Sequence, residues 1–186
     1  MQPHLGRIVE SVLFLVGKAQ ERKQTLTQYE IVKSIFLADR SHLNKYGRPI
    51  TYDNYVAMVH GPVPSTTYSI LKEDVSIVRR YGRKLPWKRR NASEIGAKSL
   101  AFHSPARSHD PDVLSGSDVK ALDEALTIVK SLDFKQTRTI IHEDAAYEAA
   151  WNDEGGRRQY PMNYSLLFGI PNAERAEELS FLSKNL

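Results

Sequence analysis

The sequence contains no cysteine among its 186 residues. Without thiols the chain can form no disulfide framework, no cysteine-ligated zinc site and no cysteine nucleophile, and this absence fits a cytoplasmic protein. The sequence also lacks any apolar run near the ~20 residues that a membrane-spanning helix needs, so we expect no membrane partner. Its length suits one domain with a sizeable core, and we expect residues 1–186 to form a single domain.

Motifs of known catalytic sites are incomplete or missing. The stretch "HEDAAYE", 142–148, begins like a zinc-protease motif but lacks the second histidine that the metal would require. "GAKS", 96–99, is similar to the end of a phosphate-binding loop, but no glycine stands five residues before it. The sequence has no Gly-x-Ser-x-Gly elbow. We therefore predict a protein that is not an enzyme, with no catalytic residue, no metal and no cofactor.

The histidines and acidic pairs of the sequence keep an enzymatic function among the alternatives. It would require His60 and His142 to converge with an acidic side chain in one pocket, because imidazole is the usual general base and metal ligand. The acids Asp39 and Asp53 are interpreted more simply as helix caps or solvated side chains. If His60 and His142 are structural, replacing either with alanine should lower the stability of the fold and should not remove an enzymatic turnover.

The net charge of +4 is unevenly distributed along the chain. The segment 75–110 holds nine Lys and Arg residues against two acids, so its charge is +7, whereas the remaining 17 basic and 20 acidic residues sum to −3. The densest part is "RRYGRKLPWKRR", 79–90, in which seven of twelve residues are basic and Tyr81 and Trp87 are interleaved. A mildly acidic body thus carries one basic segment.

Helical periodicity dominates both ends of the chain and predicts a mostly α-helical fold. Apolar residues recur at helical spacing over 5–16. Thr27 and Glu30 have the spacing of a capping box, and the helix that they begin is expected to end at Gly47. After a loop at 105–117, further helical patterns begin at Asp118 and cover 137–151 and 172–186.

The middle of the chain is expected to contain shorter elements. "GRPITYDNY", 47–55, predicts a turn into a short helix capped by Asp53, and Ser65 is expected to cap the helix after it. The segment 75–104 is different, because "VSIVRRY" and "SLAFHS" are short, partly β-branched runs separated by glycine and proline. We expect them to form a basic β-hairpin insert in the helical domain.

Rigid residues are concentrated in "HGPVP", 60–64. Pro62 and Pro64 fix their own φ angles and disfavour helical geometry in the residues before them, so the segment must run extended. Gly61 permits a sharp turn, and His60 would lie at the end of the preceding helix. We interpret the segment as a rigid corner between two helices, with direct contact to a partner as the alternative.

Three interpretations fit the basic segment 79–90. It is a solvated hairpin if Arg and Lys stems cover apolar surface with Trp87 beneath them. It is a protein-binding surface if its charge accelerates association with an acidic partner. It is a nucleic-acid-binding surface if its cations contact phosphates and its aromatics stack on bases.

Two stretches of the sequence follow the pattern of a known family. "KSIFLADRSHLNKYGRPITYDNYVAMVHGPVPSTTYSILK", 33–72, has a Lys-led apolar helix, a tight "YG-x-P-I" turn and then His-Gly-Pro-Val before an aromatic-bearing helix. "HEDAAYEAAWNDEGGRRQYPMNY", 142–164, has a histidine, a helix rich in alanines and aromatics, and then a proline and a tyrosine. Together they resemble the Panacea-domain family, the SocA-like antitoxins of toxin–antitoxin systems and prophages. The family-motif residues, which we expect to be structural, are His60, Gly61, Pro62, Val63, His142, Trp151 and Tyr164.

The resemblance implies an antitoxin that neutralises a cognate protein toxin. Neutralisation would be by direct binding, or as an adaptor that delivers the toxin to a cytoplasmic protease. The basic segment has no counterpart in the family pattern, and we hypothesise that it contacts the toxin. The residues of this hypothesis are Arg83, Lys84, Trp87, Lys88 and Arg89. The alternative function is a nucleic-acid-binding protein that uses residues 79–90.

Overall fold

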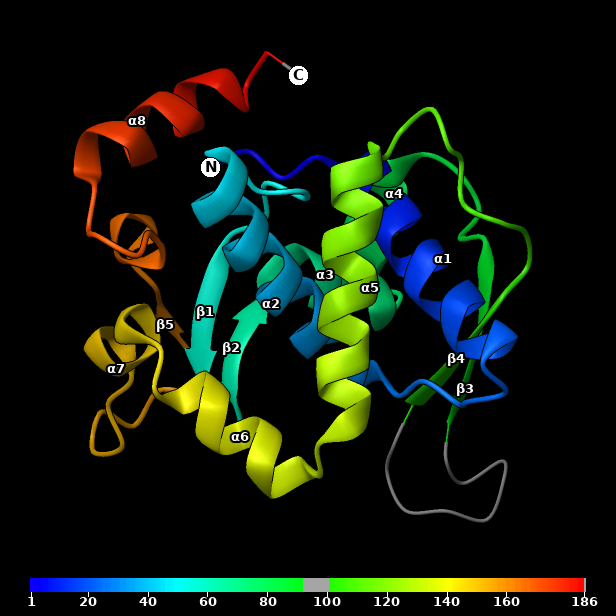
Figure 1. Cartoon of the computed structure of the whole chain (residues 1–186), viewed down its shortest axis with the longest axis horizontal. Coiled ribbons are helices and arrows are strands. Elements are labelled where there is room, and N and C mark those ends of the chain that lie inside the picture. The colour runs from blue at the N-terminus through cyan, green and yellow to red at the C-terminus, as the bar shows by residue number, and fades with distance from the viewer. Residues whose placement is uncertain (92–100, 186) are drawn as a thin grey trace.

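Three long helices form the centre of the molecule in the computed structural model, which describes residues 1–91 and 101–185 (Figure 1). Helices α1 (Leu5–Glu21) and α2 (Gln28–Tyr46) both pack against α5 (Gly116–Ser131). The other helical elements of the described residues are α3 (Ser65–Leu71), α4 (Val75–Tyr81), α6 (Phe134–His142), α7 (Ala145–Ala150), the 3-10 helix η2 (Tyr164–Leu167) and α8 (Ala173–Leu182).

Small antiparallel sheets accompany the helices. Strand β1 (Tyr55–Met58) lies between β2 (Gly61–Pro64) and β5 (Tyr160–Pro161), and β3 (Trp87–Asn91) pairs with β4 (Ala101–Pro105). The predicted fold class, mostly α with minor β, is confirmed. Within the described parts of the chain, the helices are too short or too polar to cross a membrane.

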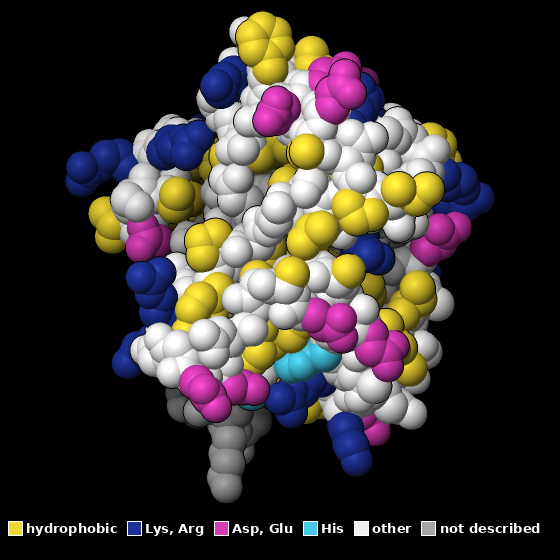
Figure 2. Space-filling model, turned by 90° about the vertical axis from the view of Figure 1, so that its left-hand side faces the viewer, with side chains coloured by type: hydrophobic (Ala, Val, Ile, Leu, Met, Phe, Trp, Pro, Cys, Tyr) yellow, Lys and Arg dark blue, Asp and Glu magenta, His cyan; other side chains and the backbone are white. Residues whose placement is uncertain are grey.

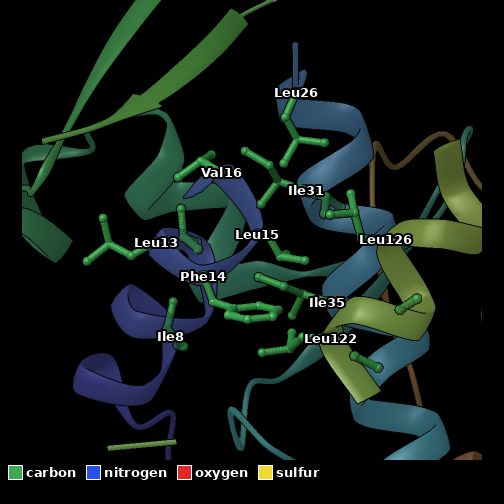
Figure 3. Close-up of a cluster of buried hydrophobic side chains, with 14 of the residues drawn as sticks. Ile8, Leu13, Phe14, Leu15, Val16, Leu26, Ile31, Ile35, Leu122 and Leu126 are labelled. Carbon is green, nitrogen blue, oxygen red and sulfur yellow. The ribbon is translucent and has the colours of Figure 1, made fainter. Parts of the chain in front are cut away.

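Buried apolar side chains form two clusters, and α2 contributes to both. Figure 3 shows the first cluster, in which Phe14 of α1, Ile35 of α2 and Leu122 of α5 point toward one another. Phe36 and Leu43, on another side of α2, belong to the second cluster, together with residues of β1, α7 and α8. Burial in two directions explains why α2 is apolar on more than one face.

Side-chain caps set the boundaries of the central helices. Thr27 Oγ1 accepts a hydrogen bond from the amide of Glu30 at 3.2 Å, and the Glu30 carboxylate accepts one from the amide of Thr27 at 2.7 Å. This confirms the predicted capping box, and Gly47, with φ 74°, ends α2 as expected. Ser115 and Asp118 form a second capping box, so α5 begins at Gly116 rather than at Asp118.

The short helix predicted to follow the cap Asp53 is wrong, because the chain forms strand β1 from Tyr55. Residues 55–58 instead pair with β2 and β5, and this sheet pairing outweighs the local helical pattern. Ser65 does not supply the cap of α3, since the capping position is Pro64 and makes no side-chain bond. The carboxylate of Asp53 instead accepts hydrogen bonds from the amides of Thr66 at 2.9 Å and Thr67 at 2.7 Å.

The strand predicted at 75–81 is also wrong, because these residues form helix α4. Asp74 caps the helix by accepting a hydrogen bond from the amide of Ser76 at 3.0 Å, and Gly82 ends it with φ 73°. These local caps outweigh the β-branched composition of the run.

The strand pair of the basic segment is β3 with β4. Positions 99 and 100 of the predicted strand 99–104 lie outside the described residues, and 101–104 belong to β4.

Candidate functional site

A groove of about 970 Å³ opens between the first turns of α2, the β1–β2 hairpin, β3 and the α5–α6 junction. Much of its wall is apolar. The apolar lining residues are Val32, Met58, Val59, Val63, Val129, Leu132 and Phe134. A concave apolar surface that also holds a few polar groups is a typical binding site.

Lys33 supplies a buried amino group to this groove. Its side chain is 1% exposed, and its Nζ donates a hydrogen bond to the carbonyl oxygen of Pro62 at 2.8 Å. The same Nζ lies 5.3 Å from the ring centroid of Tyr29. Burial disfavours the charged ammonium and lowers the pKa of Lys33 to about 7. The ion pairs formed among residues 1–91 and 101–185 do not include Lys33.

The turn of the β1–β2 hairpin fits closely over Lys33 and α6. Gly61 has φ 93°, and a Cβ atom there would lie 2.6 Å from Ile141 Cδ1 and 3.3 Å from Lys33 Nζ. Only glycine avoids both the strained φ and these contacts. His60 is exposed in the turn, and its ring lies 5.4 Å from that of Phe134.

The segment 60–64 forms the turn and second strand of a hairpin. The predicted extended run through Pro62 and Pro64 is confirmed, since both belong to β2. The predicted corner between two helices is wrong, because the element before His60 is the strand β1. Val63 is 6% exposed, belongs to the first core cluster and reaches the groove wall.

Two buried carboxylates, those of Asp39 and Asp53, hold this hairpin in place. Asp39 is 2% exposed and accepts hydrogen bonds from the amides of Ile50 at 2.8 Å and Thr51 at 3.0 Å. The hydroxyls of Thr51 and Tyr55 also donate to it. Burial outweighs these bonds and raises the pKa of Asp39 to about 6. The solvated interpretation is therefore wrong for Asp39, and Asp53 does act as a cap, although of the distant helix α3.

The downstream motif residues lie beside the groove rather than in it. The ring of His142, at the end of α6, is 4.4 Å from that of Tyr147, and burial with the nearby Arg138 charge lowers the pKa of His142. Trp151 stacks on Tyr147 with ring centroids 6.1 Å apart, and Tyr164 lies 6.0 Å from Tyr55. His142 does not line the groove that His60 borders.

Tyr147 links this aromatic group to the hairpin. Its hydroxyl donates to the carbonyl oxygen of Met58 at 2.9 Å, so α7 supports the turn of the groove wall. Among the described residues, no three His, Asp or Glu side chains are placed to hold a metal ion.

The basic residues of the toxin-contact hypothesis do not share one surface. Arg83 and Lys84 are exposed between α4 and β3, and Lys88 is exposed on β3. Trp87 is 5% exposed and packs in the first core cluster, where its ring lies 6.4 Å from that of His103. Because side chains alternate along a strand, Arg89 is on the Trp87 side, and it reaches the groove.

Sequence reasoning missed Lys33 and Asp39 as buried polar groups of this region. The sequence contains a pattern that could have identified each of these two residues. Lys33 is the charged residue within the run "IVKSIF", and Asp39 lies four residues after Ile35 and four before Leu43, on the apolar stripe of α2. A charge on an apolar helix face is a reason to expect a buried hydrogen-bond network.

Comparison with family models assigns residues 31–148 to "Antitoxin SocA-like, Panacea domain". This match covers more than half of the chain and includes Lys33, the β1–β2 hairpin, β3 and α6. The chain therefore belongs to the SocA-like antitoxin family, as its motifs indicated. Neither curated proteins nor solved structures gave a match. Family membership indicates a non-enzymatic role in a toxin–antitoxin system, with a toxin as the partner in general.

Proposed function

We propose that this protein is a cytoplasmic antitoxin that neutralises its cognate protein toxin by binding it directly, and that the groove is the centre of the contact. One observation carries the proposal. Lys33, His60 and Val63, which belong to the upstream stretch of the family pattern, all line the open groove, and the carbonyl oxygen of Pro62 accepts the hydrogen bond of Lys33. A binding function accounts for that arrangement without a catalytic group.

The basic residues outside the groove have a secondary role in this proposal. Arg83, Lys84 and Lys88 are exposed cations that would attract an acidic toxin over distance and raise the association rate. Arg89 would contact the toxin itself, because it lines the groove. Trp87 would contribute indirectly, by anchoring β3 in the core.

Two other modes of action, a proteolytic adaptor and a nucleic-acid-binding protein, lead to different expected results. A proteolytic adaptor would also bind the toxin, but the toxin would disappear from cells instead of accumulating in a complex. A nucleic-acid-binding protein would need exposed aromatic rings for base stacking. Burial of Trp87 and the packing of Tyr81 against the core make stacking by this segment less favourable, so we favour a protein partner.

Co-expression with the proteins encoded by the two flanking genes tests the proposal. One of these proteins should arrest growth when expressed alone, and the antitoxin should restore growth. The pair should co-purify in equal amounts after nuclease treatment, and the toxin should persist in cells. Recovery of nucleic acid alone, with its loss at high salt, would instead support the nucleic-acid function.

A further inference from the structure

The acidic and basic side chains of the groove differ in how they are paired. Glu30 accepts hydrogen bonds from Lys130 Nζ at 2.7 Å and from the amide of Thr27 at 2.7 Å. Asp133 accepts one from the amide of Gln136 at 2.7 Å, as the cap of α6. The two acids of the groove are therefore already engaged in local contacts.

The Lys and Arg side chains of the groove, in contrast, form no ion pair with an acid of the described residues. Lys33, Lys72 and Arg89 line the groove, and none of them forms an ion pair within 1–91 and 101–185. Lys72 lies 5.2 Å from the ring centroid of Tyr68, a contact that leaves its charge uncompensated. The groove therefore presents a positive field to whatever enters it.

Buried donors in the groove also lack acceptors. An ammonium has three N–H donors, and the hydrogen bonds found in the described part of the chain give Lys33 one acceptor, the carbonyl oxygen of Pro62. The Tyr29 hydroxyl and the Arg89 Nε are buried without a hydrogen-bond partner in the described residues. Buried polar groups without partners lower stability, and a ligand that supplies acceptors would compensate for them.

The three basic side chains lie at different depths in the groove. Lys72 is exposed, Arg89 is half-buried, and Lys33 is 1% exposed at the floor. Apolar side chains, Val32, Val63 and Phe134 among them, line the same groove. A ligand that matches this pattern carries both carboxylate and large apolar groups.

No comparable pattern occurs on the face that carries α7 and α8. Figure 2 shows Lys and Arg side chains there interspersed with Asp and Glu, and apolar side chains scattered between them. Exposed apolar residues such as Ile170 and Phe181 lie in this part of the chain, but nothing near them indicates the chemistry of a partner.

Building on the proposed function, we propose that the groove binds an acidic segment of the toxin, in which a large apolar side chain lies beside Asp or Glu. The apolar side chain packs on Val63 and Phe134, and the carboxylates pair with Lys72 and Arg89 above the buried amino group of Lys33. Charge complementarity of this kind selects the partner and speeds its association.

The test selects binders from a random peptide phage library on the intact chain. The groove variant is K72E/R89E. The matched control is K45E/R158E, which changes the net charge by the same amount at exposed positions outside the groove. Lys45 is a suitable match for Lys72, because its Nζ lies 5.4 Å from the ring centroid of Tyr46, much as Lys72 lies over the ring of Tyr68. Thermal unfolding of both variants establishes that each is folded before binding is compared.

We expect selected peptides to combine acidic and large apolar residues. Their affinity should fall roughly a hundredfold for K72E/R89E and stay within about twofold for K45E/R158E, because only the first pair would meet the peptide's carboxylates. The inference is wrong if no peptide is selected, if the peptides lack acidic residues, or if both variants weaken binding equally.

The proposed function can fail separately from this inference. If a flanking protein is neutralised by the wild type and equally well by K72E/R89E, direct neutralisation stands and the groove assignment is wrong. If acidic peptides bind the groove but neither flanking protein is neutralised, the groove assignment stands and the proposed function is wrong.

Discussion

The β1–β2 hairpin and the β3–β4 pair border the same groove, but different interactions hold them in place. Every residue of β2 is buried, and Gly61, Asp39 and Asp53 fix the first hairpin through close packing and buried hydrogen bonds. Strand β3 is mostly charged and is anchored by the buried Trp87. The first hairpin therefore forms part of the groove wall, and the second contributes Arg89, one of the three Lys and Arg side chains that line the groove. Substitutions should separate these contributions.

The largest loss of stability is expected for Trp87→Ala. Deleting a buried tryptophan from the first core cluster should lower the free energy of unfolding by about 3–5 kcal/mol. Lys88→Ala, at the next position on the exposed side of β3, should change it by less than about 0.5 kcal/mol. Urea unfolding measures both, and equal effects would show that β3 is not anchored by its tryptophan.

A somewhat smaller loss is expected for Gly61→Ala in the first hairpin. The positive φ and the overlap with Ile141 should together cost about 2–5 kcal/mol. Gly82→Ala is the control, because Gly82 also has positive φ, 73°, but no atom lies within 4 Å of its added Cβ. The control should cost only about 1–2 kcal/mol. If the two variants unfold at the same denaturant concentration, the hairpin turn is not closely packed.

The sequence predicts the central helices better than the hairpins, and the reason is physical. The capping box of Thr27 and the left-handed Gly47 are local interactions, so residues close in sequence suffice to predict them. Strand β1 is four residues long, and its pairing depends on contacts with β2 and β5 that no local pattern encodes. The groove combines segments from 27 to 137, so its cations could not be grouped from the sequence.

A third prediction concerns Lys33 and the pH dependence of stability. Burial lowers its pKa to about 7 in the folded protein, whereas the unfolded chain keeps the ordinary value of 10.5. Between these values the unfolded chain binds more protons, so the free energy of unfolding should rise with pH, by up to about 1.4 kcal/mol per unit. Below pH 7 the cost of burying the charge is fully present.

Lys33→Met should remove this rise, because methionine carries no proton to lose. Urea unfolding at several pH values from 7 to 10.5 measures the slope. Lys45→Met, at an exposed position of α2, should retain the wild-type slope. An unchanged slope in Lys33→Met would show that Lys33 keeps its charge when folded.

The smallest effect is expected from the cations outside the groove. Charge reversal at Arg83, Lys84 and Lys88 should slow association with the toxin, because exposed charges at the edge of an interface act mainly on the association rate. The dissociation rate should change little, and added salt should reduce the difference from the wild type. Stopped-flow binding separates the two rates. If reversal of these three together with Arg89 leaves the affinity unchanged, the basic segment takes no part in binding.

Toxin neutralisation by the two charge-reversal variants tests the central claim most directly. The flanking protein that arrests growth is co-expressed with the wild type, with K72E/R89E or with K45E/R158E, and growth and complex formation are measured together. The groove account predicts that K72E/R89E fails to restore growth and to co-purify with the toxin, while K45E/R158E does both as well as the wild type. Full neutralisation by a folded K72E/R89E variant would contradict it.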